Sequence, residues 1–198
     1  MKVKICGITN VHDAEYSIKK GAEFIGVILD YSVKRHGTED LIKEIKNIKK
    51  TGVVGVYTSM PDANEINEDI IQLHFDHSPG DVKYIKNVLK KNVISVIDIS
   101  KNDYLERIDE YKKAGSDYIL LEDRSGIVNR MDDLRNIDLT GIGLAGKISP
   151  ENVSNILSLN PEFIDLSSSL ESEIGKKSEK RIDELFIKLG EKNALKQY

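Results

Sequence analysis

The sequence predicts an α/β fold, a single-domain (β/α)8 TIM barrel that covers residues 1–198. About eight short, β-branched apolar segments alternate with longer amphipathic segments along the chain. The units follow one another without a linker or an unassigned tail, and 198 residues suit a compact barrel. An open doubly wound sheet is the alternative, because the alternation does not show whether the sheet closes. Both folds place the active site at the carboxyl ends of the strands.

Eight apolar segments have the length and β-branched character of buried parallel strands. The expected strands are residues 3–8, 24–29, 52–57, 70–75, 93–99, 118–122, 141–145 and 163–166. Six amphipathic segments have the polar face of a helix that covers a sheet. The expected helices are residues 11–20, 39–49, 81–90, 104–113, 150–158 and 179–189. Two connections are weaker, because residues 61–69 are short and polar and residues 130–136 offer only a brief helix.

Residues at the expected helix ends support these assignments. Thr38 and Ser149 have side chains that cap helix N-termini, and Pro150 suits a first helical position, where its missing N–H is not needed. Gly21 and Gly115 follow helix ends, where a left-handed backbone favours glycine. The sequence therefore predicts helix boundaries at these positions.

Composition and charge exclude several classes of protein. With 39% hydrophobic and 31% charged residues, the chain can bury one globular core. The net charge is −4, from 29 Lys and Arg against 33 Asp and Glu, and mixed charges give no basic surface for nucleic acid. A single cysteine excludes a disulfide within the chain, and no apolar run is long enough to span a bilayer. We therefore expect a cytoplasmic protein without nucleic-acid or membrane partners.

The first expected strand ends near the only cysteine. Side chains two residues apart share a face of a strand, so Lys4 and Cys6 point inward if Val3 and Ile5 pack against helices. A neighbouring ammonium group favours the thiolate form of a cysteine, so Cys6 is a candidate base. A buried, unreactive cysteine is the alternative.

Polar side chains also lie on the inner face of three later strands, where a purely structural strand would be apolar. The residues so placed are Gln72, His74, Glu122, Asp165 and Ser167. Glu122 is a candidate acid or base, or a partner for Lys4, and Asp123 begins the following loop. The sequence therefore predicts a polar site at the carboxyl end of the sheet.

Several segments resemble the phosphoribosylanthranilate isomerase family, whose members are (β/α)8 barrels of tryptophan biosynthesis. The likeness covers nearly the whole chain. The segments are residues 2–10 (KVKICGITN), Arg35, residues 72–74 (QLH), residues 144–153 (LAGKISPENV), residues 165–172 (DLSSSLES) and residues 175–177 (GKK).

The resemblance implies an Amadori rearrangement of N-(5-phosphoribosyl)anthranilate to 1-(2-carboxyphenylamino)-1-deoxyribulose 5-phosphate, with neither a metal nor an organic cofactor. Cys6 matches the family's base, and the acid falls on Glu122 or, with a shifted strand end, on Asp123. Arg35 matches the group that holds the anthranilate carboxylate, and Asp165 the group that contacts the sugar hydroxyls.

Other residues are expected to complete the binding site for a phosphorylated small molecule. Lys4, Gln72 and His74 are expected to line the part that holds the substrate. The phosphate should lie between the seventh and eighth units, where barrels bind phosphate with backbone N–H groups. The residues expected there are Gly146, Lys147, Ser167, Ser168 and Ser169.

The chain departs from the family pattern on the phosphate side. Residues 124–130, in the sixth loop, contain one glycine, and Lys147 and Ser169 stand where glycines are expected. These departures leave two alternatives open: a related barrel isomerase acting on another phosphorylated sugar, and a non-catalytic barrel that binds a phosphometabolite. A monomer and a homodimer are both compatible with the sequence.

Overall fold

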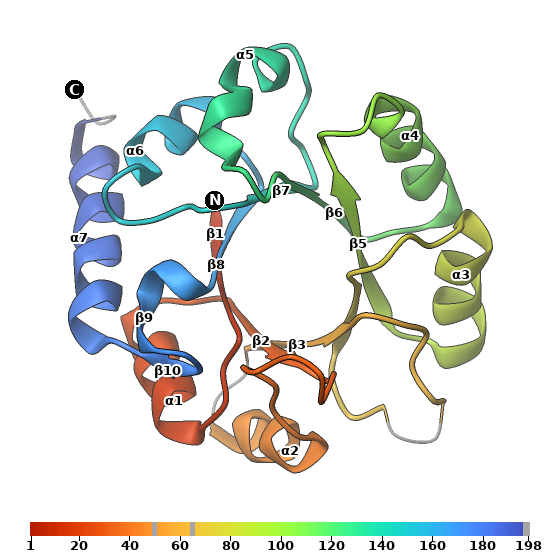
Figure 1. Cartoon of the computed structure of the whole chain (residues 1–198), viewed down its shortest axis with the longest axis horizontal. Helices are drawn as coiled ribbons and strands as arrows, with labels where there is room; N and C mark the ends of the chain where they lie inside the picture. The colour runs from red at the N-terminus through yellow and green to blue at the C-terminus, as the bar shows by residue number, and fades with distance from the viewer. Residues whose placement is uncertain (49–50, 64–65, 196–198) are drawn as a thin grey trace.

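The computed structural model describes residues 1–48, 51–63 and 66–195 and contains a closed barrel of eight parallel strands (Figure 1). The strands are β1 (Lys2–Cys6), β2 (Phe24–Ile28), β3 (Gly52–Tyr57), β4 (Ile70–Leu73), β5 (Asn92–Asp98), β6 (Tyr118–Glu122), β7 (Ile142–Ala145) and β8 (Phe163–Leu166). Neighbours in sequence are neighbours in the barrel, and β8 pairs with β1, where Lys4 lies opposite Asp165. The closure confirms the (β/α)8 prediction and excludes the open sheet.

Helices surround the barrel on its outside (Figure 1). They are α1 (Val11–Lys20), α2 (Glu39–Ile48), α3 (Pro79–Tyr84) continued by η1 (Ile85–Leu89), α4 (Tyr104–Ala114), η2 (Ile127–Arg130) with α5 (Met131–Leu134), α6 (Val153–Ile156) with η3 (Leu157–Leu159), and α7 (Glu179–Leu195). Between β8 and α7 the chain forms the turn η4 (Ser168–Leu170) and the small hairpin β9 (Glu171–Glu173) and β10 (Lys176–Lys177). Helix α7 packs against both α1 and α6, so the end of the chain closes the outer layer.

Helix boundaries follow the capping chemistry in most places. Gly21 and Gly115 are left-handed at the ends of α1 and α4, as predicted. The Thr38 hydroxyl accepts a hydrogen bond from Leu41 N at 3.2 Å, which confirms this cap. Helix α3 begins two residues before the predicted start, because Ser78 forms a capping box with Asp81.

One expectation about the helices needs correction, and a second cannot be compared. The helix predicted for residues 150–158 begins only at Val153, because Pro150 lies in a turn and the Ser149 side chain makes no N-cap bond. Helix α2 is described to Ile48, and the predicted end at residue 49 lies outside the described residues. The described residues between β3 and β4 form no helix. Instead, buried Glu68 packs against Gly55 and accepts a hydrogen bond from the hydroxyl group of Tyr57 at 2.8 Å.

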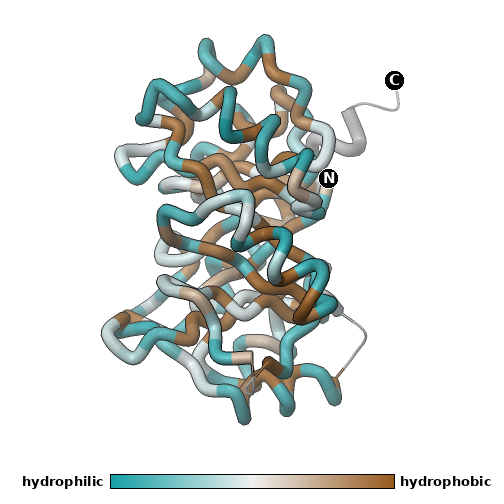
Figure 2. Tube along the Cα trace, turned by 90° about the vertical axis from the view of Figure 1, so that its right-hand side faces the viewer, coloured by the Kyte–Doolittle hydropathy of each residue, from teal (hydrophilic) through white to brown (hydrophobic). Residues whose placement is uncertain are grey.

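Strand side chains form two cores by strict alternation. One set points outward to the helices and includes Val3 and Ile5, whereas the other fills the barrel interior. The interior set is Cys6, Phe24, Val54, Val56, Ile70, Ile94, Leu120, Ala145 and Phe163. Figure 2 shows the hydrophobic segments running through the middle of the molecule, with hydrophilic turns at its edges. The predicted inward direction of Lys4 and Cys6 is therefore correct.

Candidate active site

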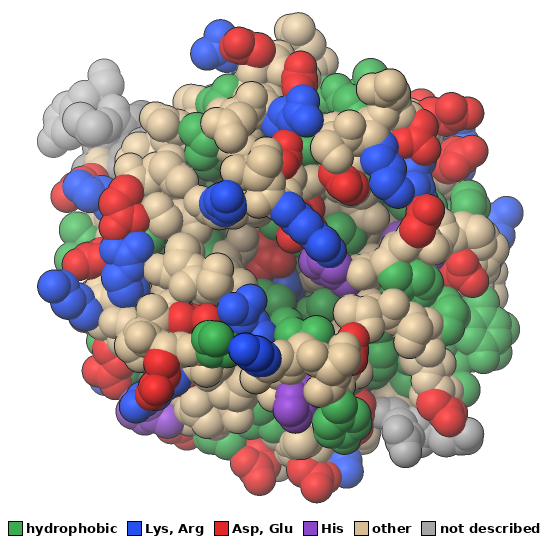
Figure 3. Space-filling model, viewed as in Figure 1, with side chains coloured by type: hydrophobic (Ala, Val, Ile, Leu, Met, Phe, Trp, Pro, Cys, Tyr) green, Lys and Arg blue, Asp and Glu red, His purple; other side chains and the backbone are tan. Residues whose placement is uncertain are grey.

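A cavity of about 370 Å³ opens at the carboxyl ends of the strands. Figure 3 views this face and shows a central hollow bordered by Lys and Arg side chains. The predicted residues that line the cavity are Cys6, Arg35, Gln72, His74, Glu122, Gly146, Lys147, Asp165, Ser167, Ser168 and Ser169. Lys4 lies beneath it, fully buried. The structure thus brings together all the predicted site residues except Asp123.

Cys6 lies at the base of the cavity beside a buried ion pair. Lys4 Nζ is 2.7 Å from Asp165 Oδ2, and the Lys4 side chain is inaccessible to solvent. Gly26 on β2 leaves room for these groups, because a Cβ there would lie 2.9 Å from Cys6 Sγ and 3.1 Å from Lys4 Nζ. The second Asp165 oxygen, Oδ1, is buried without a hydrogen-bond partner. This oxygen is a ready acceptor for a hydroxyl group of a ligand.

Electrostatics at Cys6 combine two opposing effects. The Lys4 ammonium acts to lower the pKa of the thiol, in the direction expected from the sequence, but burial has the larger effect and the pKa of Cys6 is raised. Burial likewise raises the pKa of Asp165, with Lys4 opposing it. In the absence of a ligand, Cys6 therefore carries its proton at neutral pH.

Three polar side chains form a chain across the cavity from Cys6. Gln72 Nε2 lies 3.2 Å from His74 Nδ1, and His74 Nε2 lies 3.2 Å from Glu122 Oε2. Burial acts to raise the pKa of Glu122, but the hydrogen bond from His74, with the charges of His74 and Arg124, outweighs it and lowers this pKa. Gln72 Oε1 is buried without a partner and is a second acceptor for a ligand.

Asp123 plays a different part, although it follows Glu122 directly. Its Oδ1 accepts bonds from the backbone N–H of Ser125 at 2.7 Å and from the Ser125 hydroxyl at 2.6 Å. Its Oδ2 accepts a bond from Arg130 Nε at 2.7 Å. These contacts, led by the Ser125 hydroxyl and Arg130, lower the pKa of Asp123 to about 2. Asp123 is ionised, does not line the cavity and ties the loop after β6 in place.

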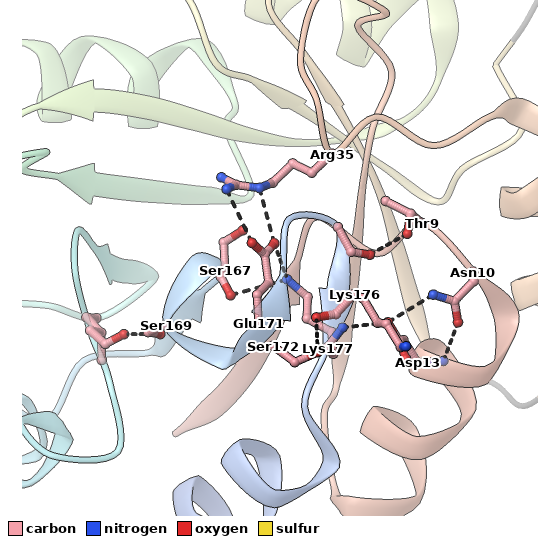
Figure 4. Close-up of polar contacts among 12 residues, drawn as sticks. Thr9, Asn10, Asp13, Arg35, Ser167, Ser169, Glu171, Ser172, Lys176 and Lys177 are labelled. Atoms are coloured by element: carbon pink, nitrogen blue, oxygen red, sulfur yellow. Dashed lines mark hydrogen bonds and ion pairs between the residues drawn. The ribbon is translucent and has the colours of Figure 1, made fainter.

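Arg35 extends to the cavity from the loop after β2 and is held by Glu171 (Figure 4). Glu171 Oε1 lies 3.1 Å from Arg35 Nε, and its Oε2 accepts a bond from Arg35 Nη2 at 3.3 Å. Lys177 Nζ donates to Glu171 Oε1 at 3.1 Å and to the carbonyl of Ser167 at 3.2 Å. Sequence reasoning assigned no role to Glu171 or Lys177. The only signal was that both lie inside the two family-like segments near the C-terminal end.

The loops after β7 and β8 form the side of the cavity expected to bind phosphate. A Cβ at Gly146 would lie 2.0 Å from the carbonyl oxygen of Asp123, so this close approach requires glycine. Lys147 adopts a left-handed backbone with φ +51°, a conformation that favours glycine. The Ser169 hydroxyl donates to the carbonyl of Ile148 at 2.5 Å, which joins the two loops. The first N–H groups of turn η4, beginning at Ser168, have no acceptor within the turn.

Two further findings concern metals and membranes. Within residues 1–48, 51–63 and 66–195, no group of three or more His, Cys, Asp or Glu side chains could hold a metal ion. In the same described part of the chain, no helix is both long and apolar enough to cross a membrane.

Comparison with known proteins matches the chain to one family. The model of the N-(5′-phosphoribosyl)anthranilate (PRA) isomerase family matches residues 3–188. The chain is 38% identical over 192 residues to the N-(5′-phosphoribosyl)anthranilate isomerase of Thermoplasma volcanium, which covers 96% of each chain.

Solved structures agree with this match. A structure of the Thermotoga maritima enzyme, described as monomers of a dimeric phosphoribosylanthranilate isomerase, superposes with a TM-score of 0.78 at 28% identity, covering 96% of this chain and 98% of that one. A phosphoribosylanthranilate isomerase in complex with reduced 1-(o-carboxyphenylamino)-1-deoxyribulose 5-phosphate has the same TM-score and identity, covering 96% and 99%. This chain therefore belongs to the N-(5′-phosphoribosyl)anthranilate isomerase family.

Proposed function

We propose that this chain is an enzyme that converts N-(5-phosphoribosyl)anthranilate to 1-(2-carboxyphenylamino)-1-deoxyribulose 5-phosphate, an isomerisation of the aldose–ketose type in tryptophan biosynthesis. The observation that carries the proposal is that Cys6 and Glu122 face one cavity, with Arg35 and the β7 and β8 loops at its edge. The reaction needs an acid and a base at different atoms of one bound sugar.

The first step opens the furanose ring. An acid must protonate the ring oxygen so that the nitrogen lone pair forms a Schiff base at C1. Glu122 is the better candidate for this acid, because it lies in the cavity within reach of the His74 ring, whereas both Asp123 oxygens are engaged outside it.

The second step removes the proton from C2. The cationic Schiff base draws electrons from the C2–H bond, so a thiolate at Cys6 can take this proton and leave an enolamine. The C2 hydroxyl of the enolamine then gives its proton to the Glu122 carboxylate, and C1 takes the proton held by Cys6, so the ketone forms and both groups are restored. Because burial raises the pKa of Cys6, its thiolate is scarce in the resting site but is a strong base once it forms.

The remaining groups bind and orient the substrate. The planar guanidinium of Arg35 suits the anthranilate carboxylate, and the free acceptors of Asp165 and Gln72 suit sugar hydroxyls. The phosphate is assigned to backbone N–H groups of the Gly146 loop and turn η4. Because the Ser169 hydroxyl is already engaged with Ile148, we assign phosphate binding to the backbone of that residue.

A related isomerisation of another phosphorylated amino sugar is the second candidate. It is favoured by Lys147, which places an exposed cation at the cavity in a backbone conformation normally left to glycine. For either reaction we expect a cytoplasmic enzyme that works as a monomer or a homodimer.

Turnover of the substrate tests the proposal. Purified wild-type protein is mixed with freshly made phosphoribosylanthranilate, and the loss of substrate fluorescence is followed beside the Cys6→Ala variant. We expect rapid loss with the wild type and a rate lower by about 10²- to 10⁴-fold for the variant. A folded wild-type protein that consumes other phosphosugar amines but not this substrate would transfer the assignment to the second candidate.

A further inference from the structure

Two buried cations flank the single cysteine from different parts of the chain. Lys4 reaches Cys6 from β1 and is paired with Asp165 from β8. Lys177, on β10, donates to the carbonyl of Ser167, and a Cβ on Gly7, the residue after Cys6, would lie 3.0 Å from Ser167 Oγ, so the ammonium group is held beside this end of β1. Its charge also acts on the thiol. Mechanistic assignments based on the sequence use Lys4 but leave Lys177 without a role.

Both the ammonium group and the backbone N–H of Lys177 are held by hydrogen bonds (Figure 4). Its ammonium group donates to Glu171 Oε1 at 3.1 Å and to the Ser167 carbonyl at 3.2 Å, and only 1% of the side chain is exposed. Its backbone N–H donates to Asp13 Oδ2 at 2.7 Å, and Asp13 is itself a buried residue at the start of α1. Burying an ammonium group costs free energy unless hydrogen bonds and an opposite charge compensate it. The contacts of Lys177 supply this compensation and hold the side chain in one position.

The charges in the two ion-pair clusters on this side of the cavity are unequal. Lys4, Lys177 and Arg35 supply three positive charges, against two negative charges from Asp165 and Glu171. On the opposite side of the cavity, Glu122 is held by His74 and Arg124. The Lys4–Asp165 pair and the Arg35–Glu171–Lys177 cluster together therefore have one positive charge in excess, which a Cys6 thiolate or a ligand carboxylate would balance.

We propose that Lys177 is a positioning residue with two tasks: it stabilises the thiolate of Cys6, and it orients Glu171 so that Glu171 holds Arg35 at the substrate. The inference rests on the proposed function, in which Cys6 is the base and Arg35 binds the substrate. Lys177 does not line the cavity and so acts through these neighbours.

The direction of the pKa shifts agrees with this arrangement. Burial lowers the pKa of Lys177, while Glu171 and Cys6 act to raise it. In return, Lys177 acts to lower the pKa of Cys6, in the same direction as Lys4. Deprotonation of the thiol and retention of the lysine proton therefore favour each other.

The pH dependence of Cys6 alkylation tests the first task without any need for turnover. Because the chain has a single cysteine, iodoacetamide reports on Cys6 alone, with Cys6→Ser as the blank. Lys177→Met should raise the thiol pKa and slow alkylation at neutral pH by about tenfold, the change that one pKa unit produces. Lys176→Met is the matched control: it removes the same charge one residue away, from a side chain that is 64% exposed and pairs with Glu173.

Glu171→Gln provides a test of opposite sign. Removal of the anion that pairs with Lys177 leaves the charge of this ammonium group less compensated, so the thiol pKa should fall and alkylation at neutral pH should be faster. The loss of the charged partner of Arg35 should raise KM severalfold with less change in kcat. If the substitutions only made the buried thiol more accessible, alkylation would be faster in both variants. Opposite changes in Lys177→Met and Glu171→Gln are therefore specific to charge.

Two results would overturn the inference. One is a Lys177→Met alkylation profile equal to that of Lys176→Met, with both proteins folded by circular dichroism. The other is slower alkylation in Glu171→Gln, which remains decisive if Lys177→Met does not fold. Absence of turnover in the wild type would count against the proposed function. Because alkylation needs no substrate, the alkylation rates would still test the effect of Lys177 on Cys6.

Discussion

At the N-terminal end of the barrel the rings of Phe24, Tyr118 and Phe163 meet edge to face, with centroids 5.6 to 5.8 Å apart. At the other end Lys4, Cys6 and Asp165 occupy the same interior, and buried oxygens lack partners. The same eight strands thus enclose a closed aromatic layer and an open polar one. The backbone of the closed barrel is the same in both layers. Only the inward-pointing side chains make one layer aromatic and the other polar.

The comparison shows where this fold gains stability and where it gives some up. Edge-to-face rings bury large apolar surfaces without leaving a polar group unpaired. In the polar layer, each unpartnered acceptor costs free energy until a ligand supplies a donor. We therefore expect substitutions near the N-terminal end to affect stability and those near the C-terminal end to affect the chemistry.

The largest effect is expected at the aromatic end. Phe163→Ala removes a ring that fills the space left by Gly143, where a Cβ would lie 2.3 Å from the Phe163 ring. The cavity should lower the free energy of unfolding by about 3–5 kcal/mol, measured by urea denaturation. A loss below about 1 kcal/mol would mean that the aromatic layer is not a main source of stability.

At the polar end, Glu122→Gln should lower kcat by about a hundredfold or more with little change in the free energy of unfolding. The amide keeps the shape of the side chain but cannot supply the proton for ring opening. Asp123→Asn is the matched control, since it weakens only the loop contacts with Ser125 and Arg130. A greater loss of kcat in Asp123→Asn than in Glu122→Gln would make Asp123 the acid and leave Glu122 with a structural role.

The pH profile of kcat/KM tests both groups together. The productive site needs a Cys6 thiolate and a protonated Glu122, whereas the pKa of Cys6 is raised and that of Glu122 is lowered. The fraction of this form is constant between the two pKa values, so kcat/KM should be flat across neutral pH and fall on either side. In Glu122→Gln only the base titrates, and kcat/KM should rise by about tenfold per pH unit up to the pKa of Cys6. A wild-type profile that already rises through neutral pH would remove Glu122 from the acid role.

The smallest effect is expected at Glu68, a buried carboxyl group that lies outside the candidate active site. Burial is the largest influence on it and raises its pKa in the folded state. The stability that it contributes is therefore present below its unfolded pKa of about 4.3 and is lost as the pH rises through the folded value. Relative to Glu68→Gln, the wild type should lose unfolding free energy as the pH rises from about 4 through the folded pKa of Glu68, as measured by urea denaturation across this range. Parallel stability curves for the two proteins would contradict this reading of Glu68.

Much of the fold follows from local sequence patterns. Alternation assigned Lys4 and Cys6 to the interior, and glycines marked the ends of α1 and α4. The connection before β4 could not be predicted, because Glu68 is buried there through contacts with β3 that its charge does not suggest.

Less of the site was predictable. The strand pattern and the family resemblance named the residues that line the cavity, but not the state of their charges. Asp123 and Glu122 are neighbours in sequence, and only the contacts with Arg130 and His74 separate their environments. Lys177 belongs to a hairpin after the last barrel strand, and its approach to Cys6 depends on how that hairpin folds back.

The central claim is that the N-terminal end of the barrel supplies stability and the C-terminal end supplies the chemistry. The most direct test compares one variant from each end. Cys6→Ala and Phe163→Leu are measured side by side for kcat with phosphoribosylanthranilate, per folded molecule, and for Tm. We predict that Cys6→Ala loses its turnover at a nearly unchanged Tm, whereas Phe163→Leu melts earlier and keeps its kcat. Wild-type turnover in Cys6→Ala, or a Phe163→Leu variant that loses kcat without losing Tm, would contradict the account.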